Sequence, residues 1–297
     1  MVKPHMTKLN DAENPGIQFT GEVKLPYFDN LLDLLAQGHE TISSSFGRHV
    51  HWGYWPQPSS VLPSAGDFAQ AAEELSRQVC LAGNITHQLG VLDVGCGFGG
   101  TVAHINENYA SMALAGLNLD ARQLARARDI VKPRGDNQID FCQGNACALP
   151  FPDQAFDVVL AVECIFHFPS RQQFFAEAYR VLKPGGFLAL SDFVSHPAIA
   201  PFTKIRLPEC LNIGFYGKCN VQYTVRHYRN LAQQTGFALR TERDITHNTL
   251  PTYTYLRWLG SQQQVAPPIA KLETITLEAL SRLKLLNYYI YGFQKAL

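Results

Sequence analysis

The chain has 297 residues, which is enough for one large domain or two small ones. It carries 25 Lys and Arg against 25 Asp and Glu, so its formal net charge is zero and no basic excess is present to bind the phosphates of a nucleic acid. Its cysteines form no C-x-x-C pair, and it has neither a signal-peptide-like start nor a run of about 18 apolar residues. We therefore expect a cytoplasmic protein without a membrane span, a disulfide framework or a zinc site.

The first part of the chain predicts helices, because apolar residues recur at helical spacing within residues 22–45 and again from Phe68 to Leu81. From Leu89 onward, short apolar runs alternate with helical segments, which is typical of a parallel sheet covered by helices on both faces. The expected strands are VLDVG, MALAGLNL, IDFCQGNA, FDVVLAVE and FLALSDFV, with helices over residues 101–109, 121–131 and 171–182. The sequence KPGG at residues 183–186 predicts a glycine-dependent turn before the fifth strand.

The pattern changes after Asp192. Residues 194–222 are rich in Pro, Gly and aromatic residues and have no clear period, so we expect them to cap the carboxyl edge of the sheet. A helix over 224–236, a strand over 237–244, a helix over 269–283 and a final strand within 285–297 complete the expected order. The prediction is an α/β fold, doubly wound and Rossmann-like, with a mainly parallel seven-stranded sheet, N-terminal helices and a cap.

The sequence VLDVGCGFGG, from Val91 to Gly100, is the strongest functional signal in the chain. An apolar strand runs into spaced glycines and then into a helix start, and such a turn lets backbone N–H groups approach a nucleotide-like cofactor. Gly95, Gly97 and Gly100 satisfy G-x-G-x-x-G, a pattern that nicotinamide dinucleotide sites share. Asp93 separates the two cases, because its carboxylate would repel a pyrophosphate and attract the ammonium group of S-adenosylmethionine.

Polar residues follow the next two expected strands, at the edge where a doubly wound sheet binds its ligand. Asn118 and Gln123 offer amides for ribose hydroxyls, and Leu119 offers an apolar surface for adenine. Asn145 offers its amide oxygen to the adenine amine, and the backbone N–H of Ala146 can reach a ring nitrogen. The alternatives are structural: Asn118 or the nearby aspartate as a helix N-cap, and Asn145 as an ordinary turn residue.

The fourth and fifth strands end near Glu163 and Asp192, and His167 lies four residues after the glutamate. On a helical turn Glu163 and His167 would share a face that points at the reactive end of the cofactor. His167 beside Asp192 would form a base with an orienting carboxylate, which suits the deprotonation of a substrate hydroxyl. The structural alternative has Glu163 as a helix cap and His167 as a half-buried histidine.

Residues 48–55, RHVHWGYW, are dense in imidazole and aromatic rings. H-x-H is also a metal-ligand pattern, but no third or fourth ligand is evident nearby, so we expect no metal and interpret the stretch as a cover that folds over a cofactor. The later aromatic residues predict an apolar or aromatic acceptor pocket under residues 194–258, with a minority of them touching the ligand. These aromatic residues are Phe202, Phe215, Tyr216, Tyr223, Tyr253, Tyr255 and Trp258.

Taken in order, these blocks resemble the class I S-adenosylmethionine-dependent methyltransferases. The resemblance spans Leu89 to Val194, through VLDVGCGFGG, GLNLDARQ, GNACALPFPDQAFDVV, AVECIFHFPSR and RVLKPGGFLALSDF. The earlier HWGYW narrows it to the small-molecule branch, which contains natural-product sugar and macrolide O-methyltransferases, tocopherol and geranyl diphosphate C-methyltransferases, and alkaloid N-methyltransferases. The resemblance implies S-adenosylmethionine as the cofactor.

The resemblance also implies a set of cofactor contacts and a division of the chain. The implied contacts are Asp93, Gly95, Cys96, Gly97 and Val162 for the methionine part, His51 and Tyr54 for its cover, and Asn118, Leu119, Gln123, Asn145 and Ala146 for the nucleoside. We expect a single domain over residues 1–297, made of N-terminal helices and cofactor cover (1–85), a cofactor-binding core (86–194), a cap segment (195–247) and a C-terminal completion of the sheet (248–297).

The sequence departs from this family at two places. Asn145 stands where an aspartate is common, and Phe166 precedes His167 where two polar residues are common, which leaves one base. Rebeccamycin-type sugar O-methyltransferases use a histidine and an aspartate at positions that match His167 and Asp192, whereas residues 245–258 are similar to geranyl diphosphate C-methyltransferases. We therefore expect O-methylation of a small, largely apolar acceptor, with C- and N-methylation left open.

Two other classes stay open from the sequence: a nicotinamide-dependent oxidoreductase, and a non-catalytic module that binds S-adenosylmethionine. The expected partner is a small-molecule substrate of natural-product metabolism, with no nucleic acid and no membrane. A homodimer is compatible with the sequence.

Overall fold

The computed structural model describes residues 25–60, 62–199, 216–217, 219–263 and 268–297. Its centre is a seven-stranded sheet in the order β3-β2-β1-β4-β5-β7-β6, in which β7 is antiparallel to both neighbours and the other pairs are parallel. The strands are β1 (Gly90–Val94), β2 (Ala113–Asn118), β3 (Gln138–Gln143), β4 (Phe156–Val162), β5 (Leu182–Ser195), β6 (Phe237–Asp244) and β7 (Leu286–Lys295). The predicted fold class is confirmed.

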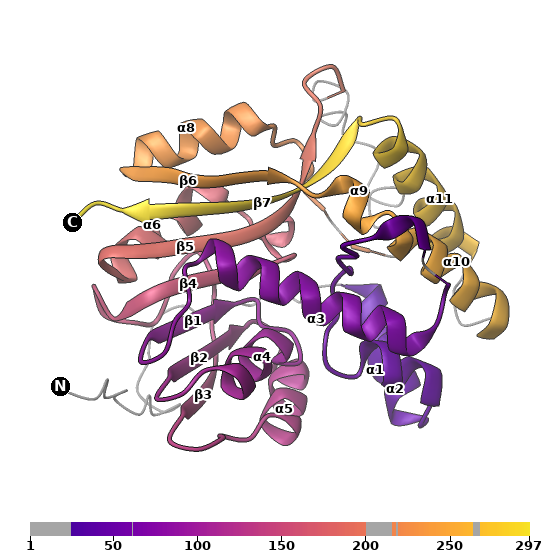
Figure 1. Cartoon of the computed structure of the whole chain (residues 1–297), viewed down its shortest axis with the longest axis horizontal. Helices are drawn as coiled ribbons and strands as arrows, with labels where there is room; N and C mark the ends of the chain where they lie inside the picture. The colour runs from indigo at the N-terminus through magenta and orange to yellow at the C-terminus, as the bar shows by residue number, and fades with distance from the viewer. Residues whose placement is uncertain (1–24, 61, 200–215, 218, 264–267) are drawn as a thin grey trace.

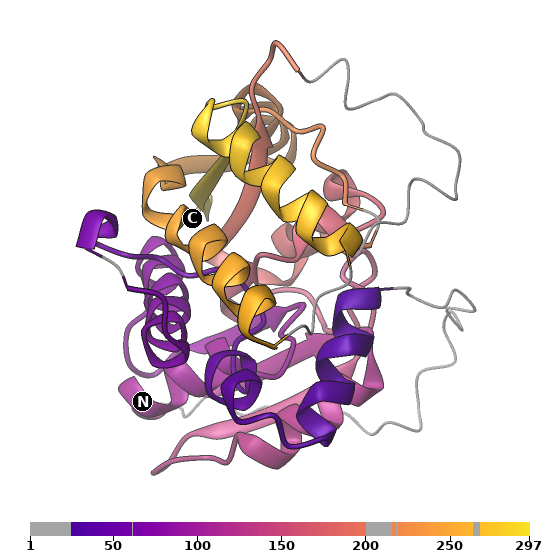
Figure 2. The same ribbon diagram turned by 90° about the vertical axis from the view of Figure 1, so that its right-hand side faces the viewer.

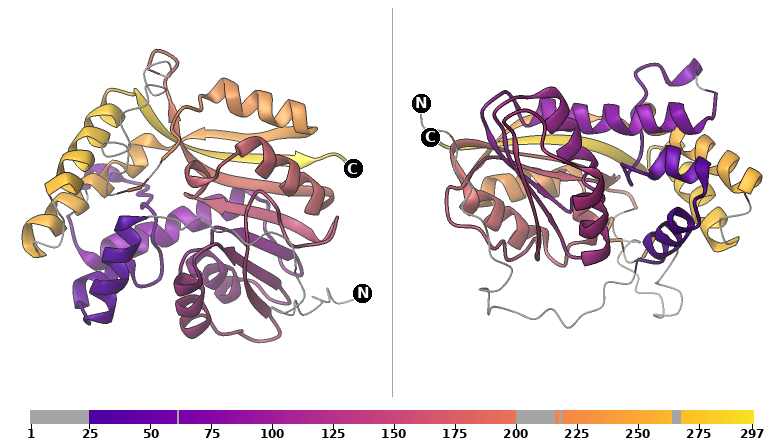
Figure 3. Two further views of the ribbon diagram at one scale, coloured as in Figure 1. Left: turned by 180° about the vertical axis from the view of Figure 1, so that it is seen from behind. Right: turned by 90° about the horizontal axis from the view of Figure 1, so that it is seen from below.

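Helices cover both faces of this sheet (Figure 1). The first face carries α3 (Ala65–Ala82), α4 (Gly100–Asn108) and α5 (Ala121–Ile130), and the second carries α6 (Arg171–Val181) and α8 (Val225–Thr235), which Figure 3 shows from behind. Every residue of β1 is buried, because a parallel strand between two helix layers meets apolar side chains on both sides. Within the described part of the chain, no helix is long and apolar enough to cross a membrane.

Short polar side chains fix most helix starts on the sheet. Asp120 caps α5 and Ser170 caps α6, each by accepting a hydrogen bond from a first-turn N–H, and Thr224 and His227 form a capping box at α8. The start of α4 differs, because it follows Gly99 in the left-handed region (φ 78°) and no described side chain caps it. Its first N–H groups are therefore available to a ligand at the carboxyl edge of the sheet.

A second group of helices gathers beyond the carboxyl ends of the parallel strands, at the right of Figure 1 and facing the viewer in Figure 2. It combines α1 (Pro26–Ala36) and α2 (Glu40–Phe46) with α10 (Pro251–Gln263) and α11 (Pro268–Arg282), so segments far apart in sequence build one cap. The remaining short elements are η1 (Pro58–Ser60), η2 (Ile165–His167) and α9 (Thr246–Thr249).

The described cap differs from the predicted one. The sequence assigned it to residues 194–222, of which 200–215 and 218 lie outside the described residues, whereas the four helices above form the described cap. The helix α10 was not predicted, because its aromatic and β-branched residues gave no clear helical period. The turn expected at residues 183–186 lies inside β5, where the pairing with β4 shifts register and Gly185 takes a φ of 77°.

Candidate active site

The glycine turn between β1 and α4 is tightly wound. Gly95, Gly97 and Gly99 have φ values of 74°, 55° and 78°, which residues with a side chain rarely adopt. Space is also limiting: a Cβ on Gly95 would lie 2.7 Å from the Cys164 side chain, and a Cβ on Gly97 would lie 2.9 Å from Val50 Cγ2. The glycines therefore serve the packing of the protein around the turn as well as the approach of a ligand.

Asp93 lies near the end of β1 and is 2% exposed. Because side chains alternate along a strand, it shares the face of Val91, which packs towards α3 and α4. Burial raises the pKa of Asp93 to about 8, since the charged carboxylate is poorly solvated there. A bound cation would restore the charged form, so this residue fits the ammonium group of S-adenosylmethionine.

Asn118 and Gln123 are brought together beyond β2. The Asn118 amide donates to Gln123 Oε1 at 2.9 Å, and Asn118 Oδ1 accepts from the backbone N–H of Asp120 at 3.2 Å. Asp120 is the residue that caps α5, by accepting from the N–H of Arg122 at 2.8 Å. Leu119 lies between them in sequence and is half-buried. The two amides form one polar unit at the strand end where a ribose is expected.

The loop after β3 places Asn145 in a turn. Its Oδ1 accepts from the backbone N–H of Cys147 at 2.9 Å, and its backbone pairs with that of Ala148. The turn role of Asn145 is therefore confirmed. A contact with adenine would use the second lone pair of the same oxygen and the backbone N–H of Ala146, which is a buried residue.

Glu163 follows Val162 at the end of β4 and has a left-handed backbone, with φ 51°. Its Oε2 accepts hydrogen bonds from the Trp52 N–H at 2.9 Å and from the Tyr288 hydroxyl. Desolvation raises the pKa of Glu163 to about 8 despite these two donors. The glutamate is thus a half-buried group whose raised pKa favours the protonated form at neutral pH, and the helix-cap alternative does not apply to it.

His167 ends η2 and is half-buried. Its Nε2 lies 3.4 Å from the hydroxyl of Tyr27, and the two rings stack with their centroids 6.2 Å apart. Burial raises the pKa of Tyr27, so the phenol keeps its proton. The sequence did not reveal Tyr27 as a partner, because the two residues are 140 positions apart and no local pattern links them.

The predicted pairing of His167 with Asp192 is wrong. The Asp192 carboxyl is fully buried, and its Oδ2 accepts from Arg171 Nη2 at 2.7 Å and from the Tyr228 hydroxyl. Because side chains alternate along β5, Phe193 faces the cavity described below, while Asp192 faces α6 and α8. Among the described residues, the hydrogen-bond partners of this carboxyl do not include His167, and the aspartate belongs to a buried ion pair.

Residues 48–55 contribute His51 and Trp52 to the site. Burial lowers the pKa of His51 to about 3, so the ring is neutral, and its Nδ1 donates to the Trp52 carbonyl at 2.9 Å. Tyr54 lies elsewhere: its ring centroid is 5.9 Å from the Arg243 guanidinium, and it does not line the described cavity. The cover stretch therefore contributes His51 and Trp52, and not Tyr54, to the wall of this cavity.

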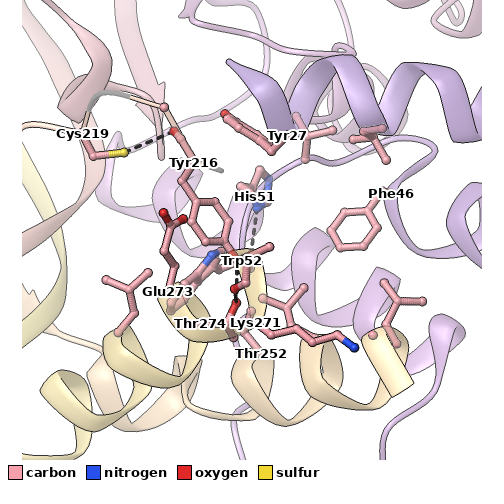
Figure 4. A pocket seen from close by; sticks show the side chains of 18 of the residues that line it. Tyr27, Phe46, His51, Trp52, Tyr216, Cys219, Thr252, Lys271, Glu273 and Thr274 are labelled. Carbon is pink, nitrogen blue, oxygen red and sulfur yellow. Dashed lines mark hydrogen bonds between the residues drawn. The ribbon is translucent and has the colours of Figure 1, made fainter. Parts of the chain in front are cut away.

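A cavity of about 810 Å³ lies between the cap helices and the carboxyl end of the sheet (Figure 4). Its mostly apolar and aromatic walls come from α1, α2, residues 50–52, η2, α10, α11 and four residues of the segment before α8: Tyr216, Gly217, Cys219 and Val221. Glu163 and His167 supply titratable groups, and the Tyr216 hydroxyl meets Thr274 Oγ1 at 3.0 Å. This volume and lining are typical of a site for a bulky organic molecule.

Of the aromatic residues that the sequence assigned to the pocket, Tyr216 lines the cavity. The others that the structure describes pack within the fold; they are Tyr223, Tyr253, Tyr255 and Trp258. Phe202 and Phe215 lie outside the described residues. Trp52 and Phe193 line the cavity instead, and their place follows from the ends of strands and the fold of the cover rather than from aromatic content.

A doubly wound sheet, a glycine turn behind an acidic strand end, an uncapped helix start and a deep pocket define a Rossmann-like, nucleotide-binding enzyme fold. A methyltransferase domain model matches residues 92–190. The chain is 31% identical over 226 residues to methyltransferase GfsG of Streptomyces halstedii, covering 74% of this chain and 77% of that protein. It is 30% identical over 231 residues to 27-O-demethylrifamycin SV methyltransferase of Amycolatopsis mediterranei (strain S699), covering 76% and 78%.

Among solved structures, geranyl diphosphate C-methyltransferase from Streptomyces coelicolor A3(2) shares the fold, with a TM-score of 0.67 and 16% identity over 93% of this chain and 100% of that chain. The chain belongs to the class I S-adenosylmethionine-dependent methyltransferases, in the branch that acts on small molecules. This membership decides between the two cofactors that the glycine pattern left open. The cofactor is S-adenosylmethionine, and the nicotinamide alternative is excluded.

Proposed function

We propose that the protein transfers the methyl group of S-adenosylmethionine to a hydroxyl oxygen of a bulky, largely apolar acceptor, with His167 as the base. The observation that carries this proposal is the position of His167 in the cavity wall, beside the carboxyl end of β4. A hydroxyl is a poor nucleophile while protonated, and a positioned base contributes about 10²- to 10⁴-fold. The related Amycolatopsis enzyme is named for 27-O-demethylrifamycin SV, which agrees with a bulky oxygen acceptor.

Different residues of the site align the reactants, remove the proton and exclude water. When bound, S-adenosylmethionine supplies an already activated methyl group, so placing the acceptor is a large part of the task. Asp93 holds the ammonium group of the methionine part, with the N–H groups of the glycine turn. Tyr27 holds the His167 ring through a long contact of 3.4 Å, which an acceptor hydroxyl can replace. Trp52 and Phe193 shield the reacting atoms from water.

The cofactor contacts in this proposal keep the residues implied by the sequence, except Tyr54. The methionine part contacts Asp93, Gly95, Cys96, Gly97, Val162 and His51, and the nucleoside contacts Asn118, Leu119, Gln123, Asn145 and Ala146.

A second candidate is methylation of a prenyl or aromatic carbon, and one feature of the same cavity favours it. Glu163 lines the cavity together with Trp52, Phe166 and Phe193, and the Phe193 ring packs against both of the other rings. Aromatic faces and a carboxylate both stabilise a developing carbocation. In its ionised form, which prevails above about pH 8, the same group can accept the proton that the methylated carbon loses.

Two variants separate the candidates, assayed on a panel of apolar alcohols, phenols and prenyl compounds with release of S-adenosylhomocysteine as the readout. With an oxygen acceptor, we expect His167→Ala to lower kcat by about 10²- to 10⁴-fold, with partial rescue at high pH, and Glu163→Gln to keep most activity. His247→Ala is the matched control, because it removes an exposed imidazole outside the cavity. An active His167→Ala with an inactive Glu163→Gln, both binding the cofactor product normally, would overturn the oxygen proposal in favour of carbon.

A further inference from the structure

Glu73, on α3, is the centre of a polar cluster behind the glycine turn. Its Oε2 accepts from His49 Nε2 at 2.6 Å, and its Oε1 accepts from His104 Nδ1 at 2.6 Å. The Arg48 guanidinium lies 3.4 Å from the same carboxylate and 2.9 Å from that of Glu107. The two imidazoles are almost fully buried, with 4% and 6% of their side chains exposed, whereas the Glu73 side chain is 33% exposed. One carboxylate thus joins α3, α4 and the stretch that contains Arg48 and His49.

The donors around Glu73 keep it ionised. Desolvation acts to raise the pKa of Glu73, but hydrogen bonds from His104 and His49, with the charge of Arg48, hold it well below its usual range. A carboxylate can only accept, so each of the two imidazole nitrogens that face it carries a hydrogen. The cluster is therefore built from charge-assisted hydrogen bonds, which are stronger than neutral ones.

His49 extends this cluster to the glycine turn. A Cβ on Gly100 would overlap His49 Nδ1 and would lie 2.7 Å from the Arg48 carbonyl oxygen. The next residue, Val50, has its Cγ2 2.9 Å from the place of a Cβ on Gly97. These residues lie directly on the turn that approaches the cofactor, so their position sets how tightly the turn is covered.

The same stretch continues into the acceptor cavity. His51 Nε2 lies 3.1 Å from His49 Nδ1, and the N–H of Trp52 donates to Glu163 at 2.9 Å. Residues 48–52 are therefore anchored at one end by Glu73 and at the other by Glu163.

We propose that Glu73 is a positioning residue for S-adenosylmethionine: it holds residues 48–52, here called the cover segment, against the glycine turn without touching the cofactor. Loss of its charge would free His49 and leave the cover segment held by the Arg48–Glu107 ion pair, the contact of His51 with Ser76 and the bond to Glu163. The segment would then lie less firmly on the glycine turn, and the bound cofactor would escape faster. The readout is cofactor binding, so the proposal stands or falls separately from the choice of acceptor atom.

The test compares Glu73→Gln with Glu74→Gln in calorimetric titrations with S-adenosylhomocysteine. Glu74 is the adjacent residue on α3, and its carboxylate bonds Arg77 at 2.7 Å and Gln78 at 2.6 Å, not the cover segment. We expect the Kd of Glu73→Gln to rise about tenfold or more through a faster dissociation rate, since charged hydrogen bonds are lost, and that of Glu74→Gln to stay within about twofold. Once an acceptor is known, KM for S-adenosylmethionine should rise while kcat at saturation stays unchanged.

Two further variants keep the proposal falsifiable if Glu73→Gln is poorly folded. His49→Gln removes the shorter contact of the cover segment with Glu73, leaving that of Arg48 at 3.4 Å, and should reproduce most of the tenfold loss, while His104→Gln leaves the His49 contact intact and should lose less. In hydrogen exchange, residues 48–52 should exchange faster in Glu73→Gln than in the wild type. Wild-type affinity in both Glu73→Gln and His49→Gln, or an equal loss in Glu74→Gln, would overturn the proposal.

Discussion

The cofactor side of the molecule and its acceptor side are built in different ways. At the ends of β1 to β3 the polar side chains that contact one another are close in sequence, as Asn118 and Gln123 are, five positions apart. At the ends of β4 and β5 they are distant, as Tyr27 and His167 are, 140 positions apart. The residues of the first side are grouped in short sequence motifs. Those of the second side come together only when the fold brings the cap helices to the ends of the strands. The acceptor pocket can therefore change while the cofactor site is kept.

The largest effect on stability is expected at the base of the acceptor side, in Arg171→Ala. This change leaves the fully buried Asp192 without its cation, so the free energy of unfolding should fall by about 3 to 5 kcal/mol. Urea unfolding followed by circular dichroism measures it. The double variant Arg171→Leu with Asp192→Leu should lose less, because no charge is left unpaired. Wild-type stability of the single variant would contradict the structural role of the pair.

The cofactor side is tested by Asp93→Ala. Loss of a charge-assisted hydrogen bond worth about 1.5 to 3 kcal/mol should weaken the binding of S-adenosylhomocysteine by about tenfold or more. The pKa of Asp93 is about 8 in the free protein, and a bound ammonium favours the ionised form, so wild-type binding should tighten as the pH rises from 6 to 8. Calorimetry at several pH values checks both points. Unchanged affinity in a folded variant, or no pH dependence in the wild type, would place the methionine part elsewhere.

The titration of Glu163 should lower the free energy of unfolding by roughly 2 kcal/mol between pH 5 and pH 7. In the unfolded chain this carboxyl ionises above its ordinary pKa of 4.5, but in the folded protein it keeps its proton up to about 8. The folded state therefore loses stability relative to the unfolded state as the pH rises through this window. Glutamine cannot ionise. The free energy of unfolding of Glu163→Gln, measured with denaturant, should therefore increase relative to that of the wild type as the pH rises over the same range. A constant difference between the two proteins would show that Glu163 is already ionised when folded.

The smallest effect is expected where the two sides touch at the surface. Arg122, on α5, meets Asp29 of α1 at 2.8 Å and Asp120 at 2.7 Å, but more than half of the Arg122 and Asp29 side chains is exposed. Arg122→Ala should therefore change the free energy of unfolding by less than about 1 kcal/mol, with a still smaller effect at high salt. A loss of several kcal/mol would mean that α1 depends on this link for its position.

The sequence predicted the fold and the identity of the cofactor, because both are signalled by local chemistry. A buried parallel strand appears in the sequence as a run of apolar residues. Gly95 and Gly97 have positive φ values, and glycine itself is the local signal for such a conformation. The acceptor side was harder. The sequence places Asp192 near the end of a strand, where a carboxylate could face the acceptor. The alternation of side chains along the strand instead directs it to the opposite face, towards Arg171. Which face a given residue takes depends on the exact register of the strand, which the sequence does not specify.

The central claim is tested most directly by identifying the product of the wild-type enzyme. The enzyme is incubated with S-adenosylmethionine labelled with ¹³C in its methyl group and with an acceptor from the panel, and the label is located by NMR. Our account predicts a methyl ether on the acceptor, one S-adenosylhomocysteine released for each ether formed, and a rate that falls by about 10²- to 10⁴-fold in His167→Ala. A label attached to carbon, or an ether formed at the wild-type rate by His167→Ala, would contradict it.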